Sequence, residues 1–592
     1  MCGFAGEVRF DGHPVDMDAL QRMSARMRAR GPDSAGLWQR GPLGLAHRRL
    51  TIIDLSHAGE QPMLDPELGL SLVFNGCIYN YRELRAELEQ QGYRFFSHSD
   101  SEVILKAYAC WGPRCVDRFL GMFAFVIAER DSGRLTMARD RLGIKPLYYA
   151  RSPGRLRFAS TLPALLAGGG VDTSIDSVAL HHYMTFHSVV PAPRTLLSGV
   201  RKLPPATLRV IEPDGTETDQ RYWAPSASRP PGLRAPEDWR DATLSALRRA
   251  VQRRMVADVP VGVLLSGGLD SSLVVALLAQ AGQRSLMTFS IGFEAAGGES
   301  GDEFEYSDLV AREFSTDHRQ LRIPSSGLLS AIDGALDNMS EPMISHDAVA
   351  FYLLSEQVSQ HVKVVQSGQG ADEIFAGYDW YPPLASVPRA AAVDAYARAF
   401  FDRTHAAMAE VLSPARLPAT DVSRELVRAH FDLPGAETTL DAALRIDTTI
   451  MLVDDPVKRV DNMTMAWGLE GRLPFLDHEL VELAAACPPE LKLAQGGKGV
   501  LKDAARQLLP ATVIDRPKGY FPVPGIRHLA GPLLDKVREA LLSRAARERG
   551  LFQPSYVQQL LASPNAIRAT LGQNQTWQLG LLELWLQRHG VC

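Results

Sequence analysis

Apolar and polar positions divide the chain into two parts with different local patterns. In the first part, short apolar runs at 70–76, 122–129 and 134–140 predict β-strands. Helical patterns at 81–92 and 102–112 separate them. Strands mixed with helices in this way are typical of an α+β domain.

The second part consists of strand–turn–helix units. The apolar run VPVGVLL leads into a glycine turn, and LDSSLVVALLAQAG predicts an amphipathic helix that follows it. Segments 285–293 and 361–373 repeat the order of strand and loop. This alternation predicts an α/β fold with a doubly wound parallel sheet. The Ala-, Leu- and Arg-rich residues 384–450 are expected to form helices that cover it.

The segment WAPSASRPPGLRAPEDW, residues 223–239, lies between the two patterns and contains four prolines. Proline fixes φ and lacks a backbone donor, so the segment predicts a stiff connector. We therefore expect a first domain over residues 2–220, a linker over 221–238 and a second domain over 239–592. The 592 residues are also too many for one hydrophobic core.

Charge and composition argue against several classes of partner. A formal net charge of −5 provides no overall basic field for nucleic acid. No apolar run approaches the ~20 residues of a membrane span, and the charged Glu7, Arg9 and Asp11 argue against an apolar signal region. The six cysteines are scattered without CxxC pairs, which argues against a disulfide framework and a structural zinc site of cysteines. A cytoplasmic protein without nucleic-acid or membrane partners is expected.

Cys2 follows the initiator methionine directly. Free cysteine usually behaves as a small buried apolar residue, so a structural role is the simpler interpretation of this residue alone. If Met1 is removed, however, Cys2 carries both a thiol and an α-amine with a pKa near ~8. A nucleophile and its general base would then share one residue.

The turn between the predicted strand and helix reads SGGLDSS, residues 266–272. Adjacent glycines let backbone N–H groups approach an anion, and the following helix N-terminus adds partial positive charge. The turn therefore suits a phosphate or pyrophosphate, although the Walker A pattern is absent. Asp270 would repel a bare phosphate, which points to a bridging Mg²⁺. A plain glycine turn with a capping serine is the alternative.

Two further segments supply candidates for the same crevice. SGQGADE, residues 367–373, also follows a predicted strand. Because the carboxyl ends of parallel strands meet at one edge of the sheet, Asp372 can approach Asp270 across a metal ion. Lys498 follows two glycines in GGKGVLK. An ordinary surface loop and a solvated lysine are the alternatives.

Taken together, the motifs resemble those of the glutamine-hydrolysing asparagine synthetase family over nearly the whole chain. The resemblance implies an N-terminal-nucleophile glutaminase domain with an α/β/β/α sandwich, followed by an ATP pyrophosphatase domain. It also implies small-molecule substrates, ATP and glutamine among them, with Mg²⁺ as cofactor, and it allows a homodimer. The motifs are MCGFAGE (1–7), RARGPD (28–33), AHRRLTIID (46–54), NGCIYNYREL (75–84), GMFAF (121–125), RDRLGIKPLYY (139–149), GVLLSGGLDSS (262–272), SGQGADEIFAGY (367–378), RVDNMTMAWGLEGRLPFLDH (459–478), RPKGYF (516–521) and LLELWL (581–586).

In the glutaminase domain, the resemblance implies that the thiol of Cys2 attacks the side-chain amide of glutamine and that its own α-amine moves the proton. Asn75 and the N–H of Gly76 would stabilise the oxyanion. Arg49 occupies the position that pairs with the substrate carboxylate, and Asp100 the position that binds its ammonium. The implied glutamine-binding residues are Arg49, Leu50, Ile52, Ile53, Asn75, Gly76, Cys77 and Asp100.

In the second domain, the resemblance implies that an acceptor carboxylate attacks the α-phosphorus of ATP and forms an acyl-adenylate. Asp270 and Asp372 would hold Mg²⁺, and Lys498 would neutralise charge on the phosphates. Ammonia, delivered through an internal tunnel, would then displace AMP. The implied ATP-binding residues are Leu265, Ser266, Gly267, Gly268, Asp270, Ser271, Ser272, Ile291, Ser367 and Gly368.

Two positions depart from the family pattern. Cys77 replaces the usual glutamate of NGEIYN, and Gln369, on the acceptor side, replaces the glutamate of SGEGxDE. This pair of variants resembles the N-acetylglutaminylglutamine amidotransferase branch, so that dipeptide is the expected acceptor. Aspartate in an ordinary asparagine synthetase is the first alternative. A β-lactam-forming relative would need no Cys2, and a nucleotide- and glutamine-binding regulator would need no nucleophile.

Overall fold

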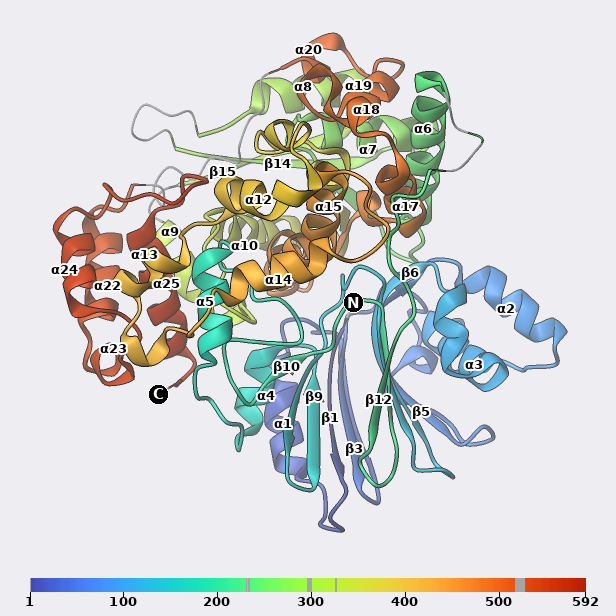
Figure 1. The fold of residues 1–592 in the computed structure, drawn as a ribbon. Helices are drawn as coiled ribbons and strands as arrows, with labels where there is room; N and C mark the ends of the chain where they lie inside the picture. Colours follow the sequence, from blue (N-terminus) through green and yellow to red (C-terminus); the bar gives the residue numbers. More distant parts are fainter. Residues whose placement is uncertain are drawn as a thin grey trace.

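The computed structural model of the chain describes residues 2–229, 232, 235–294, 301–324, 327–516 and 528–591. The motif at 516–521 is therefore described only at Arg516, and Pro230 and Pro231 of the predicted connector lie outside the described residues. Figure 1 shows a pair of sheets formed by the N-terminal residues and a larger, helix-rich part above them. Among the described residues, no helix is both long enough and apolar enough to cross a membrane.

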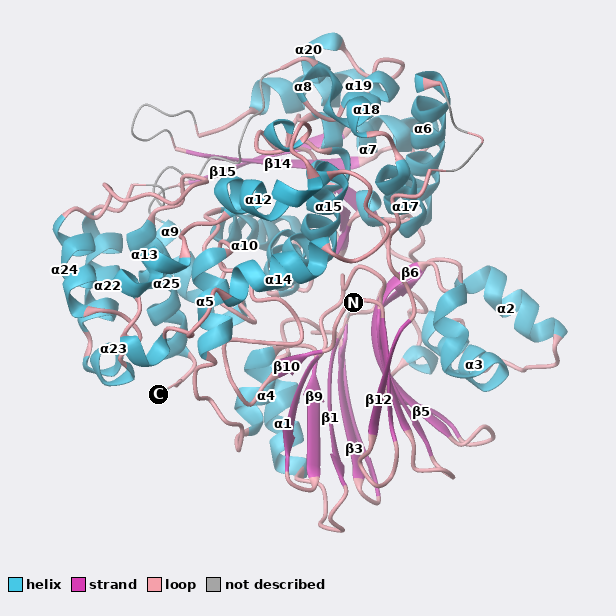
Figure 2. Cartoon of the chain, in the orientation of Figure 1, coloured by secondary structure: helices cyan, strands magenta, loops and turns pink. Residues whose placement is uncertain are grey.

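Two antiparallel six-stranded sheets form the N-terminal part (Figure 2). The first has the order β10 (Arg201–Lys202), β8 (Tyr148–Ser152), β9 (Arg155–Ala159), β1 (Gly3–Arg9), β3 (Leu43–Arg49) and β2 (Ser34–Arg40). The second has the order β12 (Glu217–Arg221), β11 (Thr207–Ile211), β7 (Leu135–Arg139), β6 (Gly121–Glu129), β5 (Leu70–Ile78) and β4 (Met63–Asp65).

Alternation along the strands places one set of side chains between the sheets and the other beneath helices. Ala124 of β6 shares a buried cluster with Phe4 of β1, whereas the adjacent Phe123 belongs to a different cluster, together with Ile104. Helices α1 (Met17–Arg26) and α4 (Leu162–Gly168) cover the first sheet, and α2 (Tyr81–Gln90) and α3 (Asp100–Trp111) cover the second. The predicted α/β/β/α sandwich is confirmed.

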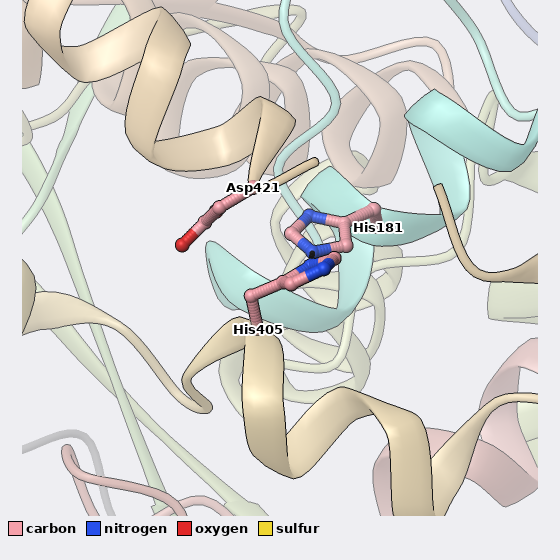
Figure 3. Close-up of side chains that lie close together, drawn as sticks. All are labelled: His181, His405 and Asp421. Atoms are coloured by element: carbon pink, nitrogen blue, oxygen red, sulfur yellow. Dashed lines mark hydrogen bonds between the residues drawn. The ribbon is translucent and has the colours of Figure 1, made fainter. Parts of the chain in front are cut away.

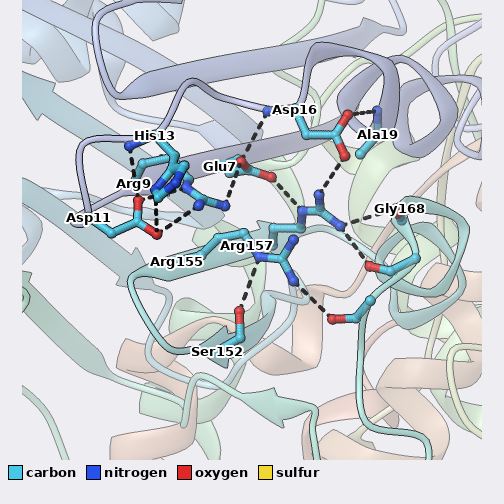
Figure 4. A network of polar contacts seen from close by, with 12 residues as sticks. Glu7, Arg9, Asp11, His13, Asp16, Ala19, Ser152, Arg155, Arg157 and Gly168 are labelled. Carbon is cyan, nitrogen blue, oxygen red and sulfur yellow. Dashed lines mark hydrogen bonds and ion pairs between the residues drawn. The ribbon is translucent and has the colours of Figure 1, made fainter.

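A buried ion pair ties the first sheet to its helices (Figure 4). The Nε of Arg157 on β9 donates to Oε2 of Glu7 on β1 at 2.6 Å. Its other nitrogens donate to the carboxylate of Asp16, which caps α1, at 3.2 Å and to the carbonyl of Gly168, in α4, at 3.0 Å. Because an unpaired buried charge is costly, this guanidinium fixes the position of the strand that begins next to Cys2.

A five-stranded parallel sheet forms the centre of the second part, which confirms the predicted doubly wound sheet. The chain runs outward from the central β13 to β15 and then returns to β16 on the other side of β13. In such sheets, ligands bind beyond the carboxyl ends of the strands where this reversal occurs. The strand order is β15 (Asp317–Ile323), β14 (Met287–Phe293), β13 (Val261–Leu264), β16 (Val364–Gln366) and β17 (Glu470–Arg472).

Helices surround this sheet and extend into a C-terminal cluster (Figure 1). Residues 384–450 are largely helical, as predicted. The helices are α5 (Ser177–Thr185), α6 (Pro236–Arg253), α7 (Leu269–Gln280), α8 (Phe304–Glu313), α9 (Leu328–Asn338), α10 (Asp347–Val358), α11 (Ala371–Phe375), α12 (Ala392–Phe400), α13 (His405–Val411), α14 (Val422–Phe431), α15 (Thr439–Ile446), α16 (Lys458–Met465), α17 (His478–Ala486), α18 (Pro489–Leu493), α19 (Gly499–Ala505), α20 (Ala511–Ile514), α22 (Gly531–Leu542), α23 (Arg544–Arg549), α24 (Pro554–Ala562) and α25 (Gln575–Arg588).

Helix α7 differs from the predicted amphipathic helix. Residues 271–278 are all buried, so α7 has no continuous solvent-facing side along this stretch. The reason is tertiary: α6, α8, α19 and α20 all contact α7 in addition to β13. A helix enclosed in this way is apolar on most of its surface.

Buried ion pairs join the two parts of the chain. Asp461 of α16 accepts hydrogen bonds from Arg30 at 2.8 Å and from Lys145 at 3.2 Å. Lys202 of β10 donates to Glu341 at 2.8 Å. Separating the two parts would leave these charges without their partners, so the pairs favour one fixed arrangement.

Candidate functional site

Cys2 is held at the head of β1 in spite of its position near the chain terminus. The neighbouring Gly3 and Phe4 pair with β3, and Phe4 N also donates to the Ser160 hydroxyl at 3.0 Å. Cys2 itself is only 8% exposed. Sheet pairing therefore removes the fraying that is usual at chain ends.

Asn75, near the end of β5, contacts the backbone nitrogen of Cys2. Its Oδ1 accepts a hydrogen bond from Cys2 N at 3.0 Å, which fixes the orientation of the amide. Asn75 is completely buried, and no acceptor among the described residues faces its Nδ2. A buried donor without an acceptor is costly unless a ligand supplies one. Nδ2 is therefore suited to a developing oxyanion beside the thiol.

Burial raises the pKa of the Cys2 thiol above its ordinary value. The resting thiol is therefore protonated at neutral pH, and attack requires a base. In a chain that begins at Cys2, the nitrogen that now donates to Asn75 would be a free α-amine on the same residue. An amine with a pKa near ~8 is suited to exchange this proton.

A small cavity of about 30 Å³ lies beside Cys2. Seven of the predicted glutamine-binding residues line the cavity. The eighth, Asn75, is not among the lining residues and contacts the backbone nitrogen of Cys2. The seven are Arg49, Leu50, Ile52, Ile53, Gly76, Cys77 and Asp100.

Arg49 and Asp100 mark two charged walls of this cavity. The Arg49 guanidinium donates to the carbonyls of Ser56 at 2.8 Å and Asp54 at 2.5 Å, so it also holds the loop that follows β3. Asp100 Oδ2 accepts from Ile78 N at 3.0 Å. Burial raises the pKa of Asp100 to about 6, which leaves a carboxylate at pH 7 with little solvent around it. A substrate ammonium would compensate that charge.

Two residues of this pocket, Glu470 and Arg472, come from β17 of the other part of the chain. Arg472 Nε donates to Glu470 at 2.5 Å, and its Nη2 lies 3.8 Å from the Cys77 sulfur. Burial alone would raise the pKa of Glu470, but neighbouring positive charges, Arg472 and Lys145 among them, hold it at about 2. Their motif, LEGRLPFLDH, is visible in the sequence, but spacing cannot show that they reach the glutaminase pocket.

A second cavity, of about 460 Å³, lies at the reversal point between β13 and β16. It contains residues of both predicted loops together with Lys498. The predicted nucleotide-site residues that line it are Leu265, Ser266, Gly268, Asp270, Ser271, Ile291, Ser367, Gly368, Gln369 and Asp372.

Gly267 and Ser272 of the predicted set do not line this cavity. A Cβ on Gly267 would lie 2.5 Å from the backbone nitrogen of Ser307, so this residue packs against α8. Ser272 is completely buried within α7. The two loops nevertheless meet closely, because a Cβ on Gly368 would lie 2.8 Å from Ser271 N.

Lys498 connects the acidic residues of the two loops. Its Nζ lies 2.7 Å from an oxygen of Asp270 and 2.9 Å from an oxygen of Asp372. Although burial would lower the pKa of Lys498, these carboxylates raise it above its ordinary value, so the ammonium stays charged. Gly377 makes room for Lys498 and its two carboxylate partners, since a Cβ there would lie 2.2 Å from Asp372 Oδ1.

Arg516 also lines the nucleotide cavity, and sequence reasoning assigned it no role. Its guanidinium donates to Glu303 at 3.0 Å and lies 4.3 Å from the ring centre of Tyr306. The motif RPKGYF was the available signal, but it gave no indication that Arg516 reaches the turn after β13.

A third cavity, of about 630 Å³, adjoins the nucleotide cavity and was not predicted. Asp347, Tyr378, Asp379 and Arg459 line both cavities. Two π-helical turns, Asp447–Met451 and Val453–Val457, contribute to its wall, as such turns often do at functional sites. Its aromatic residues include Phe186, Tyr378, Trp380, Phe400 and Trp577, and its carboxylates are Asp347, Glu373, Asp379, Asp447 and Asp455.

Comparison with known proteins agrees with this two-part arrangement. Residues 1–223 match a glutamine amidotransferase domain, and residues 242–587 match asparagine synthase. The chain belongs to the glutamine-hydrolysing asparagine synthetase family. It is an ATP-dependent, glutamine-hydrolysing amidotransferase with an N-terminal-nucleophile glutaminase fold and an ATP pyrophosphatase domain.

Several relatives match most of the synthetase. It is 31% identical to asparagine synthetase [glutamine-hydrolyzing] 1 of Bacillus subtilis, over 99% of this chain and 96% of that protein. Asparagine synthetase 3 of the same organism is 28% identical over 98% of both chains. A putative asparagine synthetase of Mycobacterium tuberculosis is 34% identical over 87% of this chain and 86% of its own length.

Proposed function

We propose that this synthetase amidates the free carboxylate of N-acetylglutaminylglutamine with ammonia released from glutamine. The observation that carries the proposal is the third cavity, of about 630 Å³, which adjoins the nucleotide cavity. Cavities of roughly 300–1,000 Å³ hold drug-sized ligands, so this one has room for a capped dipeptide. The dipeptide itself follows from the resemblance carried by Cys77 and Gln369.

We assign glutamine hydrolysis to Cys2 of a chain from which Met1 has been removed. The sulfur attacks the amide carbon of glutamine while the α-amine of Cys2 accepts the thiol proton. Negative charge then forms on the amide oxygen, where Nδ2 of Asn75 and the N–H of Gly76 can donate to it. The α-amine returns the proton to the departing ammonia. Arg49 and Asp100 are assigned to the carboxylate and ammonium of glutamine.

Adenylation of the acceptor is assigned to the second cavity. The turn at 266–272 binds the pyrophosphate of ATP. The carboxylates of Asp270 and Asp372 fit a magnesium site, because oxygens from two separate loops converge on one ammonium group. When bound there, Mg²⁺ supplies positive charge to the pyrophosphate. Lys498 compensates charge as the acceptor carboxylate displaces pyrophosphate from the α-phosphorus.

Ammonia transfer is assigned to the region around β16 and β17. Arg472 lines the glutaminase pocket, and its carbonyl accepts from Ser367 N at 2.9 Å, while Ser367 lines the nucleotide cavity. Residues that line the two sites are therefore hydrogen-bonded neighbours at the ends of adjacent strands. A protected route matters because ammonia in water at pH 7 is mostly ammonium, which is not a nucleophile.

Acceptor recognition is assigned to the wall shared by the second and third cavities. Arg459 Nη1 lies 3.6 Å from carboxylate oxygens of both Asp347 and Asp455 and donates to Ser345 at 2.7 Å. The guanidinium has further donors that can bind an acceptor carboxylate. Tyr378 and Trp380 stack with their ring centres 4.1 Å apart and offer a flat apolar surface for amide groups. Tyr378 also donates to Glu373 at 2.8 Å. Burial and, to a smaller extent, the negative charge of Asp372 raise the pKa of Glu373 to about 7. The Glu373 carboxylate can therefore accept a proton during amide formation.

Gln369 lies in the nucleotide cavity rather than in the third cavity. It offers hydrogen bonds without a charge, which does not favour the free ammonium group of aspartate. An acylated amine has no such charge. The position therefore supports an acceptor whose amine is already part of an amide.

The test is pyrophosphate release with N-acetylglutaminylglutamine and with aspartate at equal concentrations. We expect the dipeptide to exceed aspartate at least about tenfold in kcat/KM, or ~1.4 kcal/mol of transition-state binding. Gln369→Glu should shift this preference toward aspartate. Efficient asparagine formation without a signal from the dipeptide would refute the proposed acceptor.

Asparagine synthesis is the second candidate function. Asp347 and Asp379 lie where the two cavities meet, and either carboxylate could bind the ammonium of aspartate in place of the missing glutamate. The same assay decides between the two acceptors.

A further inference from the structure

Two histidines and an aspartate converge where the glutaminase and synthetase parts of the chain meet (Figure 3). His181 lies on α5, within the residues that match the glutamine amidotransferase domain. His405 begins α13, and Asp421 caps the N-terminus of α14; both lie within the asparagine synthase match. One nitrogen or oxygen from each side chain lies within 4.8 Å of the others.

Hydrogen bonds to the far side of His181 orient its ring. The hydroxyl of Ser423 lies 2.7 Å from Nδ1 of His181 and 2.9 Å from Nδ1 of His182. The Thr185 hydroxyl donates to the carbonyl of His181 at 2.8 Å, so toward Nδ1 it can only accept. These contacts fit a proton order in which His181 Nδ1–H donates to Ser423, whose hydroxyl donates to His182.

This order leaves a lone pair on Nε2 of a neutral His181. Nε2 faces Nδ1 of His405 at 3.0 Å. In metal proteins, a ligating imidazole is typically oriented by a hydrogen bond from its other nitrogen, as Ser423 provides here. The oriented Nε2 is therefore the feature that distinguishes this group from a chance cluster of polar side chains.

We propose that His181, His405 and Asp421 bind one zinc-type divalent ion that joins α5, from the residues that match the glutamine amidotransferase domain, to α13 and α14. Two imidazole nitrogens and a carboxylate oxygen suit Zn²⁺ better than Mg²⁺ or Ca²⁺, which prefer all-oxygen sites. Zn–N bonds of ~2.0–2.1 Å at a tetrahedral angle place two nitrogens roughly 3.3 Å apart. The two rings therefore need to separate by only a few tenths of an ångström. His405 and Asp421 are half-buried, which leaves a path for the ion and a position for water.

The site would stabilise the wall of the third cavity. Helix α5 leads directly into Phe186 and His187, which line that cavity. The carbonyl of Thr185, at the end of α5, accepts from Asp402 N at 2.9 Å, just before α13. An ion between α5, α13 and α14 would therefore hold these segments together without taking part in either reaction.

The test measures Zn²⁺ binding to the full-length protein after treatment with a chelator, by equilibrium dialysis and elemental analysis. We expect one bound ion per chain, with affinity at least about tenfold weaker in His405→Gln and in Asp421→Asn. Asparagine is itself a good N-cap, so Asp421→Asn should keep α14 folded. His57→Gln is the matched control, because the imidazole of His57 is 97% exposed and lies outside the cluster.

Co²⁺ gives a second readout that does not depend on catalysis. A four-coordinate N/O site gives visible d–d absorption, and thiolate charge-transfer bands would instead reveal binding at a cysteine. Loss of the d–d bands in both cluster variants, with unchanged circular dichroism, supports the site. Equal Zn²⁺ affinity in the wild type and both variants, or thiolate bands alone, would overturn it.

Discussion

The substitution Asn75→Asp tests the assigned oxyanion site with little change in shape. Aspartate keeps an oxygen for the backbone nitrogen of Cys2, which now donates to Asn75 Oδ1 at 3.0 Å. In the aspartate variant, a carboxylate oxygen takes the place of the Nδ2 donor. An ionised carboxylate has no proton to donate, so this oxygen can only accept hydrogen bonds. The change therefore removes the donor to the oxyanion and leaves the contact to Cys2 in place.

The structure indicates that Asn75→Asp will lower glutaminase activity mainly through kcat. Asn75 is completely buried, so water cannot readily replace the missing donor. Its Nδ2 has no acceptor among the described residues, so its hydrogen bond becomes available to the negative charge that forms during the reaction. Removing one oxyanion donor costs about 2.7–4 kcal/mol, a factor of ~10²–10³ in kcat. In Asn75→Asp a carboxylate would also repel the oxyanion, so the loss in kcat should lie at or beyond the upper end of this range.

The assay measures glutamate release from glutamine and, separately, amide formation from added ammonia. We expect glutamine hydrolysis to fall and ammonia-dependent synthesis to remain. Asn80→Asp is the matched control, because Asn80 bonds to Arg118 and Leu120 outside the pocket. The reasoning would be wrong if Asn75→Asp retained glutaminase kcat within tenfold of the wild type.

Three further predictions address the remaining groups. Intact-mass measurement should show that the active protein begins at Cys2, and Cys2→Ala should abolish glutamine hydrolysis while ammonia-dependent synthesis continues; an active protein that retains Met1 would contradict this. ATP should yield AMP and pyrophosphate by chromatography, and Asp270→Asn should suppress pyrophosphate while basal glutaminase activity remains; formation of ADP would contradict this. Protonation of Asp100, whose pKa is raised to about 6, would remove the charge assigned to the ammonium of glutamine, so KM for glutamine should rise as pH falls below about 6. A KM that is flat across this range, or a rise that persists in Asp100→Asn, would contradict that role.

Much of the fold was predictable because local patterns specify it. The run at 70–76 lies within β5, the helical pattern at 81–92 contains α2, and the segment at 285–293 contains β14. The exception is α7. Its expected polar face is buried because α19 and α20, which are distant in the sequence, pack around it together with the neighbouring α6 and α8.

The candidate sites were predictable where a short motif contains its own chemistry. Without Met1, Cys2 would combine a thiol with a terminal amine, and the turn at 266–272 combines glycines with a helix N-terminus. Residue type and order therefore raised a nucleophile and an anion site as candidates beside their structural alternatives. The family resemblance then placed Arg49, Asp100 and Lys498, and the structure brings each of them to the expected cavity.

The sequence by itself indicated the two-part architecture, and through the family resemblance it suggested Cys2 as the nucleophile, because those features depend on neighbours along the chain. Only the tertiary structure decided which distant groups meet. It placed Arg472 of β17 beside Cys77 of β5, and it formed a third cavity from aromatic and acidic residues on separate segments. It also brought His181 to within 3.0 Å of His405. Burial and electrostatic pairing depend on distances in space, and spacing along the chain does not specify those distances.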